Sequence, residues 1–138
     1  MCYALSGLNK YNAIFGGGPN YIVHPSDTAP ALVALGAEVT ILGAGGQRTI
    51  PLENFFILPT VANPYRENIL EPNEIITQIH LPKPIANTTS FYIKLRERSS
   101  FDFALVSIAG VFQMQGKKCQ DLSLILGGVA PAPWRSNE

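Results

Sequence analysis

The residues of this sequence that could bind a ligand are concentrated in the segment His24-Pro25-Ser26-Asp27, which stands directly before an apolar run. Ser and Asp are preferred at the start of a helix, because their oxygens accept hydrogen bonds from its free N–H groups. The same N–H groups and the positive end of the helix dipole favour an anion or a polar ligand oxygen. The segment is therefore either a helix cap or part of a binding site, and its residue types leave both readings open.

Motifs of the common catalytic sites are missing from this sequence. It has no Walker loop, no GxSxG turn, no GxGxxG between a strand and a helix, and no HExxH. His24 and His80 are far apart, and His80 lies in a predicted strand. Glu71 and Glu74 are typical of solvated loop charges. These patterns disfavour hydrolase chemistry and predict neither a catalytic side chain nor a metal site.

Charge and composition restrict the partners of the chain. Ten Lys and Arg residues balance ten Asp and Glu residues, and the pI is near 6.7, so no basic surface is available to attract nucleic acid or anionic lipid. Charged residues make up 14% and apolar residues 46%, whereas soluble domains average about 25% charged residues. The balance predicts that other polypeptide covers part of the surface; an unusually buried fold is the alternative.

The cysteines and the apolar stretches indicate a soluble protein of the cytoplasm. Cys2 and Cys119 lack CxxC spacing, so they predict neither a zinc site nor a disulfide framework, and reduced thiols are expected. The start has no basic segment followed by an apolar run. Gly, Pro or a charge interrupts every apolar stretch before it could span a bilayer. We therefore expect no export and no membrane partner.

The elements that must position the ligand-binding segment follow from the turn residues around it. Residues 1–24 are rich in Gly and Asn, which predicts a mobile segment that is cleaved readily before His24 and that has lost preceding sequence. Residues 29–35 are apolar nearly all round and are closed by Gly36, which predicts a buried helix. Residues 37–42 and 47–52 predict a hairpin around a Gly-rich turn.

The second half of the chain predicts an antiparallel sheet. A Pro- and Asn-rich connection over residues 53–72 is long for a compact domain, so we expect a boundary there. Four strands follow. They are predicted at residues 74–81, 89–98, 105–115 and 119–129, the last two joined by a tight turn. The fold class is α+β, with domains at residues 1–60 and 73–138.

Alternation along the second of these strands separates two kinds of side chain. Phe91, Ile93 and Leu95 fall on one face, which we expect to be core. A helix that begins near Ser136 is expected to cover the sheet. Polar and basic residues fall on the other face; they are Tyr92, Lys94, Arg96 and Arg98.

Taken together, the motifs resemble those of a known family. They are HPSDTAPALVALGAEV, GGQRTIPLENFF, ENILEPNEIITQIHLP, YIKLRERSSFDFALVSIAG and LILGGVAPAPWR. In this order and spacing they resemble the flavin subunit of the xanthine and carbon monoxide dehydrogenases, which are molybdenum hydroxylases. The resemblance covers essentially the whole chain. It implies the later part of a PCMH-type FAD-binding domain, followed by the truncated antiparallel-sheet domain of the flavin subunit.

The resemblance also implies an activity and a site. In the family, a substrate is hydroxylated at a molybdenum cofactor, and electrons pass through 2Fe-2S clusters on partner subunits to FAD and then to NAD or another acceptor. Asp27, with Ser26 beside it, matches the segment that contacts the flavin. Ile76 matches a residue that packs by the isoalloxazine, and Lys94 one that reaches the flavin site. A cation there would stabilise the negative charge of reduced flavin.

A purely structural role is also open for each of these residues. Ile76 is equally well explained as plain core, and Lys94 as an exposed strand lysine. Arg96 and Arg98 share the face of Lys94 and could pair with a partner domain.

The sequence also departs from the family. The Gly-rich phosphate loop and the second Gly-Asn-rich loop are missing, so we expect weak FAD binding, or none, and no activity by the isolated chain. The opening CYALSGLNKYNAIFGG resembles a branch whose flavin subunit carries a four-iron cluster. Cys2 matches one ligand of that cluster, but Asn20 stands where a later cysteine is expected, so a free thiol is the favoured reading of Cys2.

Two alternatives to the flavin subunit remain. The chain could be a non-catalytic remnant or docking module that no longer binds FAD by itself. It could also belong to another PCMH-type flavoenzyme, such as a peptidoglycan-precursor reductase, although GGVAPAPWR favours the molybdenum group.

Overall fold

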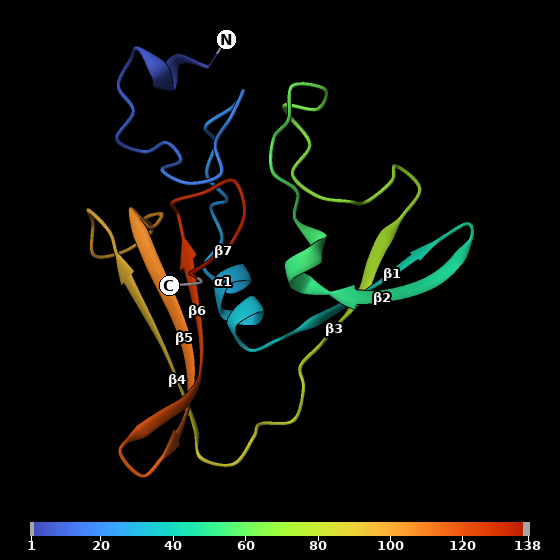
Figure 1. The fold of residues 1–138 in the computed structure, drawn as a ribbon. Coiled ribbons are helices and arrows are strands. Elements are labelled where there is room, and N and C mark those ends of the chain that lie inside the picture. Colours follow the sequence, from blue (N-terminus) through green and yellow to red (C-terminus); the bar gives the residue numbers. More distant parts are fainter. Residues whose placement is uncertain (1, 137–138) are drawn as a thin grey trace.

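A computed structural model describes residues 2–136 and contains two antiparallel sheets with a helix between them (Figure 1). The strand order is β2-β1-β3 in the first sheet and β4-β5-β6-β7 in the second. The predicted α+β class is confirmed. In chain order the elements are η1 (Tyr3–Leu5), α1 (Thr28–Ala34), β1 (Glu38–Gly43), β2 (Gly46–Pro51), η2 (Leu52–Phe55), β3 (Ile75–His80), β4 (Thr88–Leu95), β5 (Val106–Gln115), β6 (Lys118–Gly127) and β7 (Trp134–Arg135).

Helix α1 and the first hairpin form where the sequence predicts them. Gly36 ends the helix at a φ of +70°, a left-handed conformation that glycine adopts without a steric penalty. β1 and β2 then pair across a turn that Gly46 closes, also with a positive φ. Val39 and Ile41 of β1 are fully buried. The hairpin therefore places one apolar row of β1 in the core, and Thr40 of the other row is buried as well.

Strand β3 belongs to the first sheet, so the prediction of residues 74–81 as a strand of the second sheet is wrong. Val39 pairs with Ile79 and Ile41 with Ile76 in an antiparallel ladder. The residue pattern identified the strand, but a period of two residues carries no information about which neighbour a strand joins. The predicted domain ranges, 1–60 and 73–138, stay a prediction, and the pairing of β3 favours a later division.

The second sheet contains the other three predicted strands and a short fourth one. The hairpin of β5 and β6 turns at Gly116, whose φ is +61°. Trp134–Arg135 form β7 along β6, and Ser136 continues this pairing by donating its N–H to the carbonyl of Leu124. Extended backbone therefore stands where a helix was predicted to begin. The rest of that predicted helix, residues 137–138, lies outside the described residues.

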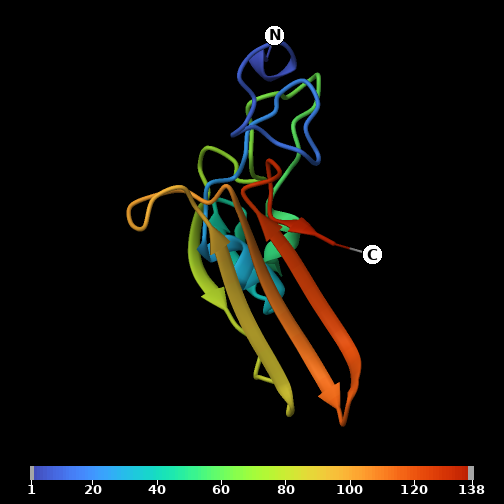
Figure 2. The ribbon, with the colours of Figure 1, turned by 90° about the vertical axis from the view of Figure 1, so that its left-hand side faces the viewer.

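The core is continuous between the two sheets: α1 packs on β5 and β6, and η2 contacts both α1 and the first hairpin. Val33 of the helix joins Ile41 of β1 and Ile125 of β6 in one buried cluster. The face of the second sheet that is turned toward α1 is called the inner face here, and its opposite is the outer face. Figure 2 looks onto the outer face, with α1 behind the long strands.

The polar and apolar rows of β4 occupy the opposite sides from those expected. The Ile93 side chain on the outer face is 61% exposed, whereas Lys94 on the inner face is 16% exposed. Lys94 fits there because its partner on β5 is the small Ser107, and Tyr92 likewise pairs with Ala109. The prediction that the row of Phe91, Ile93 and Leu95 forms core is therefore wrong for the described residues.

Candidate functional site

In the segment before α1, one residue caps the helix and the next is available to bind other groups. The Ser26 hydroxyl oxygen accepts a hydrogen bond from the N–H of Ala29 at 3.0 Å, which caps the helix. The Asp27 side chain makes no capping hydrogen bond, although Asp27 is the residue that flanks the helix. Ser26 therefore serves the helix, and the carboxylate of Asp27 is free to bind elsewhere.

Asp27 binds two side chains of strand β4. The Tyr92 hydroxyl donates to Oδ1 at 2.9 Å, and the Lys94 ammonium donates to Oδ2 at 2.7 Å. Tyr92 and Lys94 are two positions apart, so both lie on the inner face. The structure thus brings together Ser26, Asp27 and Lys94, three of the residues predicted for the site, and adds Tyr92, which was not predicted for it.

The protonation states of Asp27 and Tyr92 are set by their neighbours. The hydrogen bond from Lys94 lowers the pKa of Asp27 below its ordinary value, with further contributions from the Tyr92 hydroxyl and the charge of Arg96. Burial raises the pKa of Tyr92, and the bond to Asp27 raises it further. At neutral pH the group is therefore a carboxylate between a neutral phenol and a lysine. The alternative reading of Lys94 as an exposed strand lysine is wrong.

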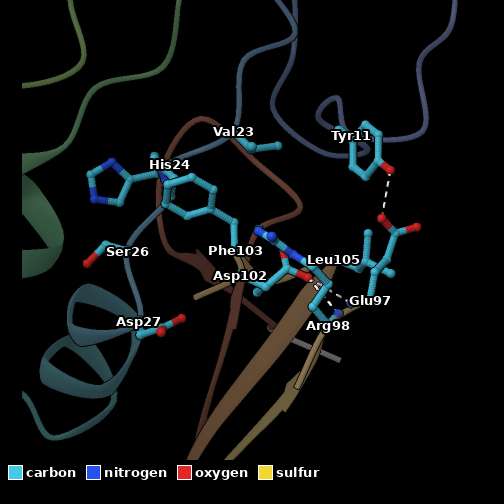
Figure 3. Close-up of a pocket in the computed structure, with 13 residues that line it drawn as sticks. Tyr11, Val23, His24, Ser26, Asp27, Glu97, Arg98, Asp102, Phe103 and Leu105 are labelled. Atoms are coloured by element: carbon cyan, nitrogen blue, oxygen red, sulfur yellow. Dashed lines mark hydrogen bonds and ion pairs between the residues drawn. The ribbon is translucent and has the colours of Figure 1, made fainter. Parts of the chain in front are cut away.

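A cavity of about 380 Å³ opens beside this group (Figure 3). Its walls come from the N-terminal segment, the residues that lead into α1, and the loop between β4 and β5. Tyr11 lies on one side, Ser26 and Asp27 on the other, and Phe103 with Leu105 between them. Its volume is within the roughly 300–1,000 Å³ of small-molecule sites. The walls combine apolar rings with a few charged groups, as such sites do.

The loop between β4 and β5 is braced by its own acidic residues. Asp102 accepts hydrogen bonds from the N–H groups of Glu97 at 3.0 Å and Arg98 at 2.9 Å. Glu97 in turn accepts from the Tyr11 hydroxyl at 2.8 Å and pairs with Lys10. These bonds fasten the N-terminal segment across one end of the cavity. The mobility predicted for residues 1–24 stays a prediction.

His24 lines the cavity without forming a hydrogen bond through Nδ1. Its ring meets the edge of Phe56 at a centroid distance of 4.8 Å. Burial lowers the pKa of His24, and the charge of Glu67, 3.8 Å from Nδ1, acts in the opposite direction. A neutral imidazole at neutral pH follows, so His24 contributes shape and polarity here rather than positive charge.

Ile76 is not among the residues that line this cavity. It lies on β3, opposite Ile41, and its side chain is 42% exposed. The alternative reading of Ile76 as plain core is therefore wrong, and its role beside a flavin stays a prediction. Sequence analysis missed Tyr92, Glu97 and Asp102. Only Tyr92 left a signal, as a polar residue on the face of Lys94.

Neither cysteine is paired: both Cys2 and Cys119 are free thiols. Backbone N–H groups of Ala4 and Tyr21 lower the pKa of Cys2. Within residues 2–136, no three His, Cys, Asp or Glu side chains are grouped closely enough to hold a metal ion. The same residues contain no helix with the length and hydrophobicity needed to cross a bilayer.

Comparisons with known proteins identify two family domains in this chain. Residues 13–84 match the model of the FAD binding domain in molybdopterin dehydrogenase, and residues 91–138 match the carbon monoxide dehydrogenase flavoprotein C-terminal domain. The first match ends after β3, and the second begins within β4. An aldehyde oxidoreductase FAD-binding subunit, PaoB of Escherichia coli K12, is 40% identical over 97% of this chain and 41% of its own length.

Solved structures show the same likeness. Carbon monoxide dehydrogenase from Hydrogenophaga pseudoflava superposes with a TM-score of 0.68 at 31% identity, over 78% of this chain and 36% of that one. The reconstituted enzyme from Oligotropha carboxidovorans also gives 0.68, at 27% identity, over 92% of this chain and 39% of that one. The chain therefore spans about two fifths of the length of these three relatives.

Proposed function

Given that this chain belongs to the FAD-binding subunits of the molybdenum hydroxylase family, we propose that it supplies one part of a flavin site. The observation that supports the proposal is the group of Asp27, Tyr92 and Lys94 beside a cavity. We also propose that the division between the two domains lies in the connection between β3 and β4, beside the gap at residues 85–90 that separates the two family matches.

The residues present fit part of an FAD molecule. The cavity of about 380 Å³ is at the small end of ligand sites, so it suits a portion of a dinucleotide rather than the whole. Ser26 and Asp27 line it, and the ammonium of Lys94 is held on Asp27. The phosphates would need donors from outside this chain, since the sequence lacks the phosphate loops of the family.

The bound flavin would accept and release the electrons, and the protein would bind it and adjust its electrostatics. Lys94 is suited to stabilise negative charge at the ring, because its side chain is only 16% exposed and is therefore partly shielded from water. Asp27 holds that ammonium in place. We assign Ile76 to packing by the isoalloxazine, because its exposed side chain is available for contact.

The wider reaction extends this proposal to the assembly. We infer that electrons reach the flavin from 2Fe-2S clusters on a partner subunit and originate at a molybdenum cofactor on another. An acceptor such as NAD would remove them. The rest of the FAD domain, absent from this sequence, would supply the phosphate site, and the assembly would work in the cytoplasm as an oxidoreductase. The isolated chain would be inactive.

Flavin retention after desalting tests this function directly. The chain is incubated with FAD, alone and with a separately expressed N-terminal part of the Escherichia coli relative, and bound flavin is read from its visible absorbance. We expect retention only with the added part. Lys94→Met should weaken FAD binding about tenfold, the loss of one charge-assisted contact of about 1.5 kcal/mol.

The matched control for this experiment is Lys117→Met, in the exposed turn between β5 and β6. It removes the same charge far from the cavity and should leave retention unchanged. Flavin lost in every combination would exclude the half-site function. Equal effects of both substitutions would exclude a specific role of Lys94.

A docking module is the second candidate, and the outer face of the second sheet favours it. Ile93, Leu95 and Leu122 are each more than half exposed on that face. Such contiguous apolar surface is uncommon on isolated monomers and marks interaction sites. Failure of the flavin experiment would leave docking as the favoured role.

A further inference from the structure

The hydroxyl of Tyr92 occupies one oxygen of the carboxylate that holds Lys94. It donates to Oδ1 of Asp27 at 2.9 Å while Lys94 donates to Oδ2 at 2.7 Å. A carboxylate that is hydrogen-bonded through one oxygen can still rotate about its side-chain bonds. Bound through both, it is fixed in one orientation, and so is the ammonium that depends on it.

The surroundings of Tyr92 are built to hold this arrangement. On β5, Ala109 lies opposite Tyr92, and Ser107 lies opposite Lys94. Ala109 and Ser107 are almost fully buried. These small side chains let the phenol and the lysine lie across the sheet toward the start of α1. Ser26 caps that helix, so Asp27 is not diverted to its N–H groups.

We propose that Tyr92 is a positioning residue for Lys94, acting through Asp27. Its hydroxyl orients the carboxylate, so that the ammonium of Lys94 is held at one point. Lys94's place at a flavin rests on the proposed function, whereas the order of contacts from Tyr92 to Asp27 to Lys94 does not.

Removing one oxygen atom separates this role from simple packing. Tyr92→Phe keeps the ring and deletes the donor, and Tyr65→Phe, at a tyrosine that is 83% exposed, is the matched control. The readouts in the full chain are the pKa of Asp27, followed by NMR of its side-chain carboxyl, and the rate at which acetic anhydride labels Lys94. Neither readout requires FAD.

In Tyr92→Phe we expect the pKa of Asp27 to rise toward its ordinary value, because a donor to the charged form is lost while Lys94 and Arg96 remain. Labelling of Lys94 should accelerate about two- to tenfold, the range of a single hydrogen bond. Tyr65→Phe should change neither. An unchanged Asp27 pKa and unchanged labelling in Tyr92→Phe would overturn the positioning role.

A second variant keeps the test decisive if Tyr92→Phe does not fold. Asp27→Asn removes the charge that Tyr92 faces, so the pKa of Tyr92 should fall while its burial continues to raise it. A Tyr92 pKa that is identical in the variant and the parent would show that the phenol does not hold the carboxylate, and would overturn the proposal.

The flavin itself provides a further measurement that separates the two proposals. In protein that retains FAD with the added N-terminal part, Tyr92→Phe should lower the midpoint potential, because reduced flavin then faces a less effective cation. If labelling of Lys94 changes but the potential does not, Tyr92 positions Lys94 and the placement of Lys94 at the flavin is wrong.

Discussion

The two faces of the second sheet are made by the same strands but differ in burial. On the inner face, Ala109 and Ile125 are buried against α1, and Lys94 and the partly exposed Tyr92 lie beside them. On the outer face, Ile93 and Leu95 are more than half exposed. Alternation therefore separates side chains into two rows, but the row that becomes core depends on which element packs against the sheet.

This contrast places polar chemistry on the covered side. A lysine tolerates partial burial when a carboxylate neutralises it and hydrogen bonds satisfy both groups. Asp27 meets that condition from outside the sheet, at the start of α1. The inner face is consequently both the core of the fold and the wall of the candidate site.

The contrast predicts its largest effect for a truncation on the inner face. Ile125→Ala should lower the free energy of unfolding by about 2–5 kcal/mol, because Ile125 is fully buried and a cavity would remain. Ile93→Ala, the same change on the outer face, should have a much smaller effect. Urea denaturation of both variants measures the difference, and equal losses would break the comparison.

A smaller effect is expected from the charge on the inner face. Asp27→Asn should lower the free energy of unfolding at neutral pH by about 0.2–1 kcal/mol, the range for ion pairs with an exposed partner. The Asp27 side chain is half exposed, which limits the gain. Denaturation at pH 7 measures it, with Asp121→Asn, at an exposed position of β6, as a control that should have less effect.

The stabilisation by Asp27 should also depend on pH with a definite sign. The folded pKa is lowered, so the unfolded chain binds the proton more readily. The contribution is complete above the ordinary value near 3.8 and is lost as the pH falls through the lower folded value. Denaturation midpoints between about pH 6 and pH 2 should converge for the parent and Asp27→Asn. Curves that stay parallel would contradict this origin.

The smallest effect on stability is expected on the outer face. Ile93→Ser should change the free energy of unfolding by no more than about 0.5 kcal/mol, as for most surface positions. It should nevertheless reduce the fluorescence of bound 8-anilinonaphthalene-1-sulfonate, a dye that binds exposed apolar surface. The matched change Ile41→Ser in the core should unfold the chain instead. Dye binding that Ile93→Ser leaves unaltered would show that another surface binds it.

Local features of this fold were predictable from the sequence because their causes are local. Gly36 ends α1 and Gly116 turns the β5–β6 hairpin, and both adopt the positive φ that glycine permits. The resemblance likewise identified Asp27 and Lys94, which the structure brings into contact. Turn residues and family motifs can both be recognised within a short segment, without knowledge of its distant partners.

Features that depend on distant partners were not predictable in the same way. The sequence identified β3 as a strand, but its pairing with β1 is made across the long connection between them. Tyr92 was visible only as a polar strand residue, because its function arises from Asp27, far away in the chain. The same limit explains why the wrong row of β4 was expected to be core.

The position of α1 between the two sheets also sets the order in which the protein can fold. The helix is near the start of the chain, but the strands that it contacts most are β5 and β6, near the end of the chain. Contacts between such distant segments form slowly, because a long loop must close before they give any stabilisation. During synthesis the β1–β2 hairpin can form early, yet the core cannot close until the ribosome has released β6. The two sheets should therefore unfold in a single cooperative transition rather than one after the other.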